Sequence, residues 1–291
     1  MSKNRTGPCR NGARGIWLSL VVGFALLPSG VVLATAEQSF HDAWRLARQY
    51  NRDRAAAVLA IARAWEQTRY DAGTLQSNPG ELNLIVRFDR LDCWTLVELA
   101  TAVVWSAENT AQPDYSDFLA RLRALRYRDG RVAGYGSRLH YFSEWLDQSE
   151  RLGLLADHTA ALGGETYSKP IGFMTRDRAH YPALADPATL ATVRNAEAAL
   201  SGIQRSFIPK ARVAEIEPEL RDGDLVAITS TRPGLDIAHQ GLIVRRGERA
   251  YLLHASSEFG RVLVSRWPLA EYLNRNRSQG GIVVARWRVE S

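Results

Sequence analysis

A polar residue and a cysteine precede an apolar run in the segment Arg90-Leu91-Asp92-Cys93-Trp94-Thr95-Leu96-Val97-Glu98. From position 92 to about 105, apolar residues nearly encircle a helix, which predicts a helix buried in the centre of the domain. Asp92 is suited to cap this helix, because its carboxylate can accept a first-turn amide N–H. Cys93 would then lie at the positive end of the helix dipole, where we expect thiolate to be favoured over thiol. First-turn amides would also face an oxyanion formed on an attacked carbonyl. The competing interpretation is a buried structural cysteine.

Residues 1–36 have the pattern of an export signal. Their first part carries four basic residues and no acid, an apolar run covers residues 16–33, and Ala34-Thr35-Ala36 has the small-x-small form of a cleavage site. We therefore expect a bacterial protein that is exported, to the periplasm or beyond the cell. An uncleaved anchor helix is the alternative. Cys9 would leave with the signal, so Cys93 would have no partner for an internal disulfide and would be buried, paired with another chain or chemically active.

Removing 36 residues from 291 leaves 255, enough for a single domain. The predicted signal holds four of the six net positive charges, so the basic character belongs partly to the signal. No run of Lys or Arg with interleaved aromatic residues follows it, which argues against a nucleic-acid partner. Nothing after residue 36 is long and apolar enough to span a membrane. We expect a monomer.

Three stretches follow the signal. Residues 38–69 and 92–105 are predicted helical, with a turn at 78–80 and an extended segment at 82–88. Residues 106–210 are predicted to be a helical and loop-rich insertion, with helices at 115–127, 138–154 and 188–201 and a long ordered loop at 163–187. Residues 211–289 are predicted to be mostly β, with strands at 225–229, 239–245, 250–254, 262–266 and 282–288. Helices first and a meandering sheet afterwards indicate an α+β fold.

Two histidines lie in one predicted hairpin, His239 at the start of its first strand and His254 at the end of its second. If Arg246-Gly247 is a two-residue turn, His239 faces His254 and both imidazoles share one face of the sheet. One could then act as general base to the thiol while the other orients it. Two alternatives remain open: unrelated strand-end histidines, or a zinc site made by Cys93 and both histidines. No close ligand spacing such as C-x-x-C is present, so we expect neither a metal nor another cofactor.

Eight short segments follow one another along the chain over roughly residues 60–290: Tyr70-Asp71-Ala72-Gly73-Thr74-Leu75, Leu91 to Glu98, Arg138-Leu139-His140-Tyr141, His180-Tyr181-Pro182-Ala183-Leu184, Ile208-Pro209-Lys210, Asp222-Gly223-Asp224-Leu225-Val226, Gly234 to Gly241, and Leu253-His254-Ala255-Ser256-Ser257. In these segments and their order, the chain resembles the NlpC-type superfamily of papain-like cell-wall cysteine amidases. It is most similar to the N-acetylmuramoyl-L-alanine amidase-like family within it.

This resemblance implies a single papain-like amidase domain over residues 37–291. The nucleophile would stand at the N-terminus of a buried helix, packed on an antiparallel sheet that carries the histidines. Cys93 would be the nucleophile, His239 the general base and His254 its orienting residue. The substrate-binding residues implied are Tyr70, Asp92, His140 and Tyr141. Trp94 and Leu139 depart from the family pattern, and we expect the bulky Trp94 to narrow the cleft near the scissile bond. Arg138 and Asp236 are interpreted as ion-pair or turn residues outside the site.

The activity implied is cleavage of the N-acetylmuramic acid–L-alanine bond in peptidoglycan or muropeptide fragments. Two alternatives stand beside it: an endopeptidase for the γ-D-glutamyl-diaminopimelate bond, and a non-catalytic wall-binding module on the same fold. Composition and spacing by themselves indicate only an exported thiol hydrolase.

Overall fold

The computed structural model describes residues 35–75 and 83–289. Apart from positions 35 and 36, the predicted export signal lies outside the described residues, as does the predicted turn at 78–80. Helix α1 (Ala36–Ala47) begins within the predicted cleavage motif, with Thr35 as its cap. Within the described ranges, no helix is long and apolar enough to cross a membrane.

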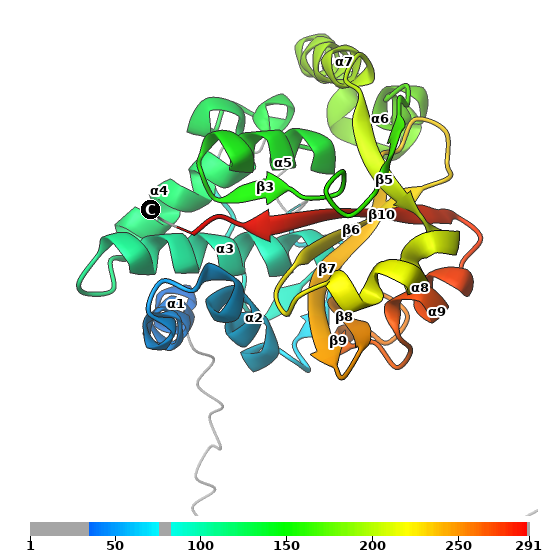
Figure 1. The fold of residues 1–291 in the computed structure, drawn as a ribbon. Coiled ribbons are helices and arrows are strands. Elements are labelled where there is room, and N and C mark those ends of the chain that lie inside the picture. Colours follow the sequence, from blue (N-terminus) through cyan, green and yellow to red (C-terminus); the bar gives the residue numbers. More distant parts are fainter. Residues whose placement is uncertain (1–34, 76–82, 290–291) are drawn as a thin grey trace, which may run out of the picture. The chain divides into compact units, whose positions relative to one another are not determined.

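Five helices form a layer on one side of a large sheet (Figure 1). They are α1, α2 (Arg54–Ala64), α3 (Cys93–Asn109), α4 (Tyr115–Arg126) and α5 (Phe142–Arg151). The region predicted helical, residues 38–69, contains two helices, α1 and α2, which are separated because Asn51 and Arg52 have positive φ and Asp53 caps a new helix through the Ala56 N–H. The buried central helix is confirmed: α3 contacts α1, α2 and α4 and also strands of the sheet.

The sheet runs in the order β2-β1-β9-β8-β7-β6-β10-β5-β4, and β3 also pairs with β10. All its ladders are antiparallel except β1 with β2. Its strands are β1 (Arg69–Tyr70), β2 (Arg90–Leu91), β3 (Leu155–Asp157), β4 (Glu165–Tyr167), β5 (Arg205–Pro209), β6 (Leu225–Ser230), β7 (Ile237–Arg246), β8 (Arg249–Ser256), β9 (Arg261–Val264) and β10 (Gln279–Trp287). Helices on both faces of a mostly antiparallel sheet confirm the predicted α+β class.

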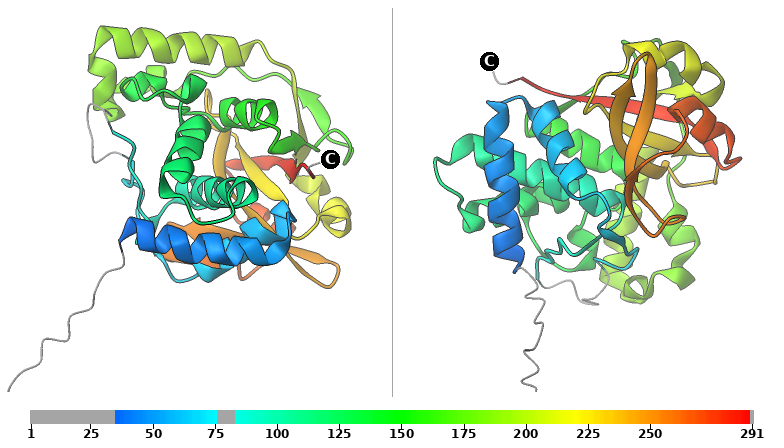
Figure 2. Two further views of the ribbon diagram at one scale, coloured as in Figure 1. Left: turned by 90° about the vertical axis from the view of Figure 1, so that its left-hand side faces the viewer. Right: turned by 90° about the horizontal axis from the view of Figure 1, so that it is seen from below.

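The second face of the sheet is covered by α8 (Val213–Ile216) and α9 (Leu269–Asn274), as two views in Figure 2 show. Residues alternate between the two cores along each strand, as the pleat requires. On β7, Leu242 and Val244 face α3, whereas Ile243 faces α8 and α9. Each strand therefore carries side chains to both helical layers, and a strand end can contribute polar groups on either side.

The predicted insertion at residues 106–210 is largely part of the main structure. Phe118 of α4 and Trp145 of α5 are buried in the same core as α3. Strands β3 and β5 pair with β10. Only the segment containing α6 (Phe173–Arg176) and α7 (Pro187–Ser201) has a small core of its own. The predicted loop at 163–187 contains β4, α6 and two 3-10 turns, which are too short to produce a readable sequence period.

The register of the histidine hairpin differs from the prediction. Arg246 pairs with Arg249 and Leu242 with Leu253, so the turn is Gly247-Glu248 rather than Arg246-Gly247. Gly247 has a φ of 61°, a conformation that favours glycine. Each partner moves by two residues relative to the prediction. Because side chains alternate with a period of two, this shift leaves every side chain on its expected face.

Candidate active site

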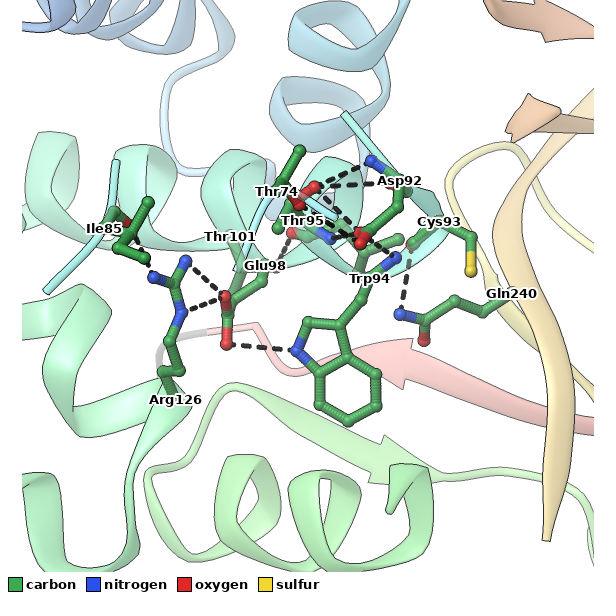
Figure 3. Close-up of polar contacts among 11 residues, drawn as sticks. Thr74, Ile85, Asp92, Cys93, Trp94, Thr95, Glu98, Thr101, Arg126 and Gln240 are labelled. Carbon is green, nitrogen blue, oxygen red and sulfur yellow. Dashed lines mark hydrogen bonds and ion pairs between the residues drawn. The ribbon is translucent and has the colours of Figure 1, made fainter. Parts of the chain in front are cut away.

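Cys93 is the first residue of α3, and Asp92 caps this helix as predicted. One Asp92 carboxylate oxygen accepts hydrogen bonds from the backbone N–H groups of Trp94 at 3.0 Å and Thr95 at 2.7 Å. The Asp92 N–H in turn donates to the Thr95 hydroxyl at 2.9 Å, completing a capping box. Figure 3 shows this network beside the sulfur of Cys93. The cysteine is a free, half-buried thiol.

The surroundings of Cys93 favour the protonated thiol. Burial, followed by the nearby Asp92 carboxylate, raises the pKa of Cys93 to about 12. Hydrogen bonds from the backbone N–H groups of Gln240, Cys93 and Trp94 act in the opposite direction but do not outweigh burial. Our expectation that the helix end favours thiolate is therefore wrong for the free site, because desolvation of the anion is the larger effect. Deprotonation of Cys93 requires a base.

His239 and His254 form a directly bonded pair, so their predicted proximity is confirmed. His239 Nε2 lies 2.6 Å from His254 Nδ1, and the two rings are nearly perpendicular, with centroids 4.8 Å apart. With the observed register continued, His254 falls opposite Gly241, diagonal to His239 on the same face. A Cβ atom at position 241 would lie 3.0 Å from the His254 Cβ. Glycine at this position therefore leaves space for the imidazole pair.

Both imidazoles are neutral at neutral pH. Burial lowers the pKa of His239 to about 4, and burial together with the charge of His239 lowers the pKa of His254 to about 3. In the tautomer in which His239 Nε2 donates to His254 Nδ1, Nδ1 of His239 carries no proton. A neutral imidazole of this kind can accept a proton.

Gln240 ties strand β7 to the start of α3. Its side-chain Nε2 donates to the Cys93 carbonyl oxygen at 3.1 Å, and the residue itself is buried (Figure 3). Gln240 directly follows His239 on β7. The residue that contacts Cys93 and the first histidine of the imidazole pair are therefore neighbours in one strand. Gln240 was not among the residues predicted for the site. The available signal was a polar residue in an apolar strand, which needs a partner when buried.

Two tyrosines lie near the thiol. Tyr70 pairs with Leu91 across the parallel β1–β2 ladder, which places it beside Asp92 and Cys93. Burial and the charges of Cys93, Asp92 and Asp71 raise the pKa of Tyr70 to about 12. Tyr272 of α9 contacts His254 edge to face, with centroids 5.4 Å apart. Burial is the main cause that raises its pKa to about 12, and the charge of Cys93 contributes. Tyr272 therefore links the thiol to the histidine pair, a role that sequence analysis missed.

His140 and Tyr141 make their polar contacts away from Cys93. His140 Nε2 lies 2.9 Å from the Tyr135 carbonyl oxygen, and burial holds the pKa of His140 well below its usual value. Tyr141 is 2% exposed; its hydroxyl donates to Glu197 at 2.7 Å and accepts the Met174 N–H at 3.0 Å. These bonds attach the segment of α6 and α7 to α5. The Tyr141 hydroxyl is therefore engaged in contacts that hold these segments together.

Trp94 does not occupy the space in front of the sulfur, contrary to our expectation. Its indole N–H donates to Glu98 at 3.3 Å, and its ring stands edge to face with Trp145 at 6.2 Å. Figure 3 shows the indole and the sulfur leaving the helix in different directions. Trp94 is therefore part of the packing between α3 and α5.

The zinc alternative finds no ligand set. Over residues 35–75 and 83–289, no three His, Cys, Asp or Glu side chains are arranged to hold a metal ion.

Arg138 and Asp236, which we placed outside the site, are both buried. Asp236 accepts the backbone N–H and the hydroxyl of Ser143 at 3.0 and 2.9 Å, which fixes α5 to the start of β7.

The fold is similar to that of several solved structures. An N-acetylmuramoyl-L-alanine amidase from Bacteroides uniformis is 35% identical, with a TM-score of 0.75 over 79% of this chain and 98% of its own. A Bacteroides fragilis protein that carries a provisional xylanase description is 36% identical, with a TM-score of 0.73 over 77% and 98% of the two chains. A Legionella pneumophila protein at 19% identity and a TM-score of 0.62, over 87% and 95%, shares the fold. A comparison with curated proteins finds no match.

The family match below, together with the Bacteroides uniformis amidase, indicates a hydrolase of amidase type that is related to peptidoglycan. The family model AmiA-like, described as N-acetylmuramoyl-L-alanine amidase-like, matches residues 60–282. The chain belongs to this family. The match covers every residue from Tyr70 to His254 discussed above, and Tyr272 as well.

Proposed function

We propose that this chain is a papain-like cysteine hydrolase that cleaves the amide bond between N-acetylmuramic acid and L-alanine. Membership of the amidase-like family supports the substrate class. The observation that carries the mechanism is the bonded His239–His254 pair, because His239 directly precedes Gln240, whose side chain bonds the Cys93 carbonyl oxygen. A buried thiol with a raised pKa needs a base to remove its proton.

In the first step, Nδ1 of His239 takes the proton of Cys93 as the sulfur attacks the lactyl carbonyl carbon of the substrate. Thiolate and imidazolium are each disfavoured alone by burial, but as a pair they stabilise one another at low dielectric. The carbonyl oxygen becomes an oxyanion, for which the backbone N–H groups at the start of α3 are the donors. His254 accepts or shares the proton on Nε2 and so fixes the imidazole that carries the charge.

In the second step, His239 returns its proton to the nitrogen of L-alanine and the C–N bond breaks, which releases the peptide and leaves a thioester on Cys93. Water then attacks the thioester with His239 again as base. The thioester C–S bond breaks, the muramic acid lactyl group leaves as a carboxylic acid, and Cys93 regains its proton. The net reaction adds one water across one amide bond and needs no cofactor.

Among the remaining predicted site residues, we assign Tyr70 to substrate or oxyanion contact, since its hydroxyl stays protonated near the sulfur. Asp92 is assigned to capping, because its oxygens already accept bonds from Trp94, Thr95 and Thr74. Tyr141 is assigned to packing, and His140, bonded to Tyr135, to the support of the same segment. Action on cell-wall material implies export, in line with the signal predicted for residues 1–36.

The alternatives differ in the bond that breaks. An endopeptidase would cut between γ-D-glutamate and diaminopimelate, and a wall-binding module would cut nothing. Xylan hydrolysis, suggested by the description of the Bacteroides fragilis neighbour, requires a pair of carboxyl groups flanking the glycosidic bond. Asp92, the carboxylate next to Cys93, is fully engaged as a helix cap. The arrangement of Cys93 and the histidines favours acyl transfer.

Mass spectrometry of digested muropeptides tests the proposal. We expect free L-alanyl peptides and intact disaccharide with the wild type, and no product with Cys93→Ala, whose fold should be unchanged. Release of diaminopimelyl fragments would favour the endopeptidase, and no product from any muropeptide would reject the enzyme. Inactivation by iodoacetamide and indifference to a chelator would distinguish thiol from zinc chemistry.

A further inference from the structure

A pocket of about 350 Å³ opens beside the histidine pair on the α9 side of the sheet. This volume is within the range of small-ligand sites. Its floor is made by β8 and the start of β10, and its walls by α9 and the turns that flank this helix. We call it the His254 pocket, after the histidine that links it to the site. The residues that line it and enter the argument are His254, Glu258, Trp267, Tyr272, Arg275 and Gln279, together with Arg266.

Two arginines line the His254 pocket, and the guanidinium groups of both lie against the same indole ring. The guanidinium carbon of Arg275 lies 4.0 Å from the Trp267 ring centroid, and that of Arg266 lies 4.9 Å from the same ring. Neither makes an ion pair within the described part of the chain, whereas ion pairs are made by Arg54, Arg126, Arg205, Arg249 and Arg286. Glu258 is the one acidic residue of the lining, so the lining carries a net positive charge. Two ordered guanidinium groups are suited to a carboxylate.

The floor of the pocket contains an unused hydrogen-bond acceptor. Gln279 is 5% exposed, and its side chain lies close enough to the Tyr272 hydroxyl to lower the pKa of that group against the effect of burial. Its Oε1 atom has no hydrogen-bond partner among the described residues. A buried carbonyl oxygen without a donor destabilises the free protein, and a ligand N–H would satisfy it. The pocket thus offers cations for a carboxylate and an acceptor for an N–H, the two polar groups of a peptide with a free acid.

The position of the His254 pocket indicates which side of the substrate it receives. His239 must protonate the leaving nitrogen, so the leaving group lies on the histidine side of the sulfur. His254 bonds His239 and also lines the pocket. Tyr272, which contacts His254, also lines the pocket, and the charge of Cys93 contributes to its raised pKa. In the proposed reaction the leaving group is the stem peptide, whose second residue carries an α-carboxylate.

We propose that the His254 pocket is the subsite for the stem peptide, with Arg266 and Arg275 binding the free α-carboxylate of its D-glutamate and Gln279 accepting a peptide N–H. The identity of the ligand rests on the proposed function. The enzyme would then prefer muropeptides whose glutamate is a free acid over those in which it is amidated to isoglutamine. Charge-assisted bonds of this kind are worth about 1.5–3 kcal/mol, or roughly 10- to 100-fold in affinity.

Titration calorimetry of the Cys93→Ala protein measures this subsite without turnover. We expect L-alanyl-γ-D-glutamate to bind about 10-fold or more tightly than L-alanyl-D-isoglutamine. The double variant Arg266→Gln/Arg275→Gln, made in the same background, should bind both dipeptides equally. Arg277→Gln is the matched control, since Arg277 is exposed and outside the lining. Equal binding of the two dipeptides, binding of neither, or a preference that persists in the double variant would each overturn the subsite.

Turnover separates this inference from the proposed function. With an intact Cys93, kcat/KM for N-acetylmuramoyl-L-alanyl-γ-D-glutamate should exceed that for the isoglutamine form by about 10- to 100-fold, and the double variant should lose the difference. Equal kcat/KM values would reject the subsite while leaving the amidase function intact. Discrimination in binding without cleavage of either compound would retain the subsite and reject the proposed reaction.

Discussion

The protein contains two buried pairs of polar side chains that differ in charge: one is an ion pair and the other is neutral. In the helical layer, Glu98 and Arg126 form an ion pair at 2.7 Å, with both side chains 1% exposed. In the sheet, His239 and His254 form an uncharged pair at 2.6 Å. The guanidinium of Arg126 stays charged at any physiological pH. The imidazoles can change protonation. The permanently charged pair holds α3 in place, whereas the neutral histidine pair is available for proton transfer.

The surroundings of the two pairs explain the difference. Arg126 also donates to the Ile85 carbonyl, and Trp94 donates to Glu98, so the ion pair has hydrogen bonds for its remaining groups (Figure 3). Among the described residues, the two imidazoles hydrogen-bond only one another and His254 also contacts the ring of Tyr272, and burial lowers both of their pKa values. Buried charges persist where they are fully bonded, and titratable groups without such bonds become neutral.

The largest effect expected is on turnover. His239→Asn should lower kcat for the N-acetylmuramoyl-L-alanine bond by about 10³-fold or more, because the asparagine cannot take the Cys93 proton. The free energy of unfolding should change little by comparison. His180→Asn is the control, since His180 is exposed and bonded only to Asp177. Retention of more than a tenth of the wild-type kcat in His239→Asn would show that the neutral pair is not the proton acceptor.

The ion pair should determine stability instead. Arg126→Met leaves Glu98 buried without its guanidinium, and we expect the free energy of unfolding to fall by about 3–5 kcal/mol in a denaturant titration. Glu98→Gln/Arg126→Met removes both charges and should recover most of this loss. If the double variant is as unstable as the single one, packing rather than charge explains the effect. A loss below about 1 kcal/mol would contradict the assignment of this pair as the fixed one.

The sequence predicted the helix side of the site more completely than the sheet side. Asp92 and Cys93 act within one helical turn, so capping chemistry was visible in the local sequence. The histidine pair was found through a hairpin whose predicted register was off, and it survived because the shift preserved the faces. Gln240, Tyr272 and Arg126 contribute through contacts with residues far away in the chain. Such contacts depend on how layers meet, which no local pattern encodes.

Acidification should distinguish the pairs more finely. The folded-state pKa values of His239 and His254, about 4 and about 3, lie below the usual 6.5, so between these values the unfolded chain binds more protons than the folded one. Their stabilising effect is full above pH 6.5 and is lost as pH falls toward 4 and below. The loss should be on the order of a few kcal/mol. Denaturant titrations at several pH values give the free energy of unfolding as a function of pH. For His254→Gln, this free energy should depend less steeply on pH in this window. An unchanged slope would mean that other groups control acid unfolding.

The smallest effect on stability is expected for a third buried pair, Tyr141 with Glu197. In this pair a neutral hydroxyl donates a hydrogen bond to a carboxylate. Tyr141→Phe removes a bond to Glu197, which still accepts the Thr175 N–H at 3.1 Å, and leaves the Met174 N–H without its acceptor. We expect a loss of about 1–2 kcal/mol in unfolding free energy. Muropeptide kcat/KM should stay within about twofold, because this pair holds α6 and α7 rather than substrate.

Tyr70→Phe is the matched variant: it should keep stability and lower kcat/KM, since its hydroxyl lies near Cys93. A drop in kcat/KM for Tyr141→Phe at unchanged stability would return Tyr141 to the substrate-binding role that the family resemblance implies.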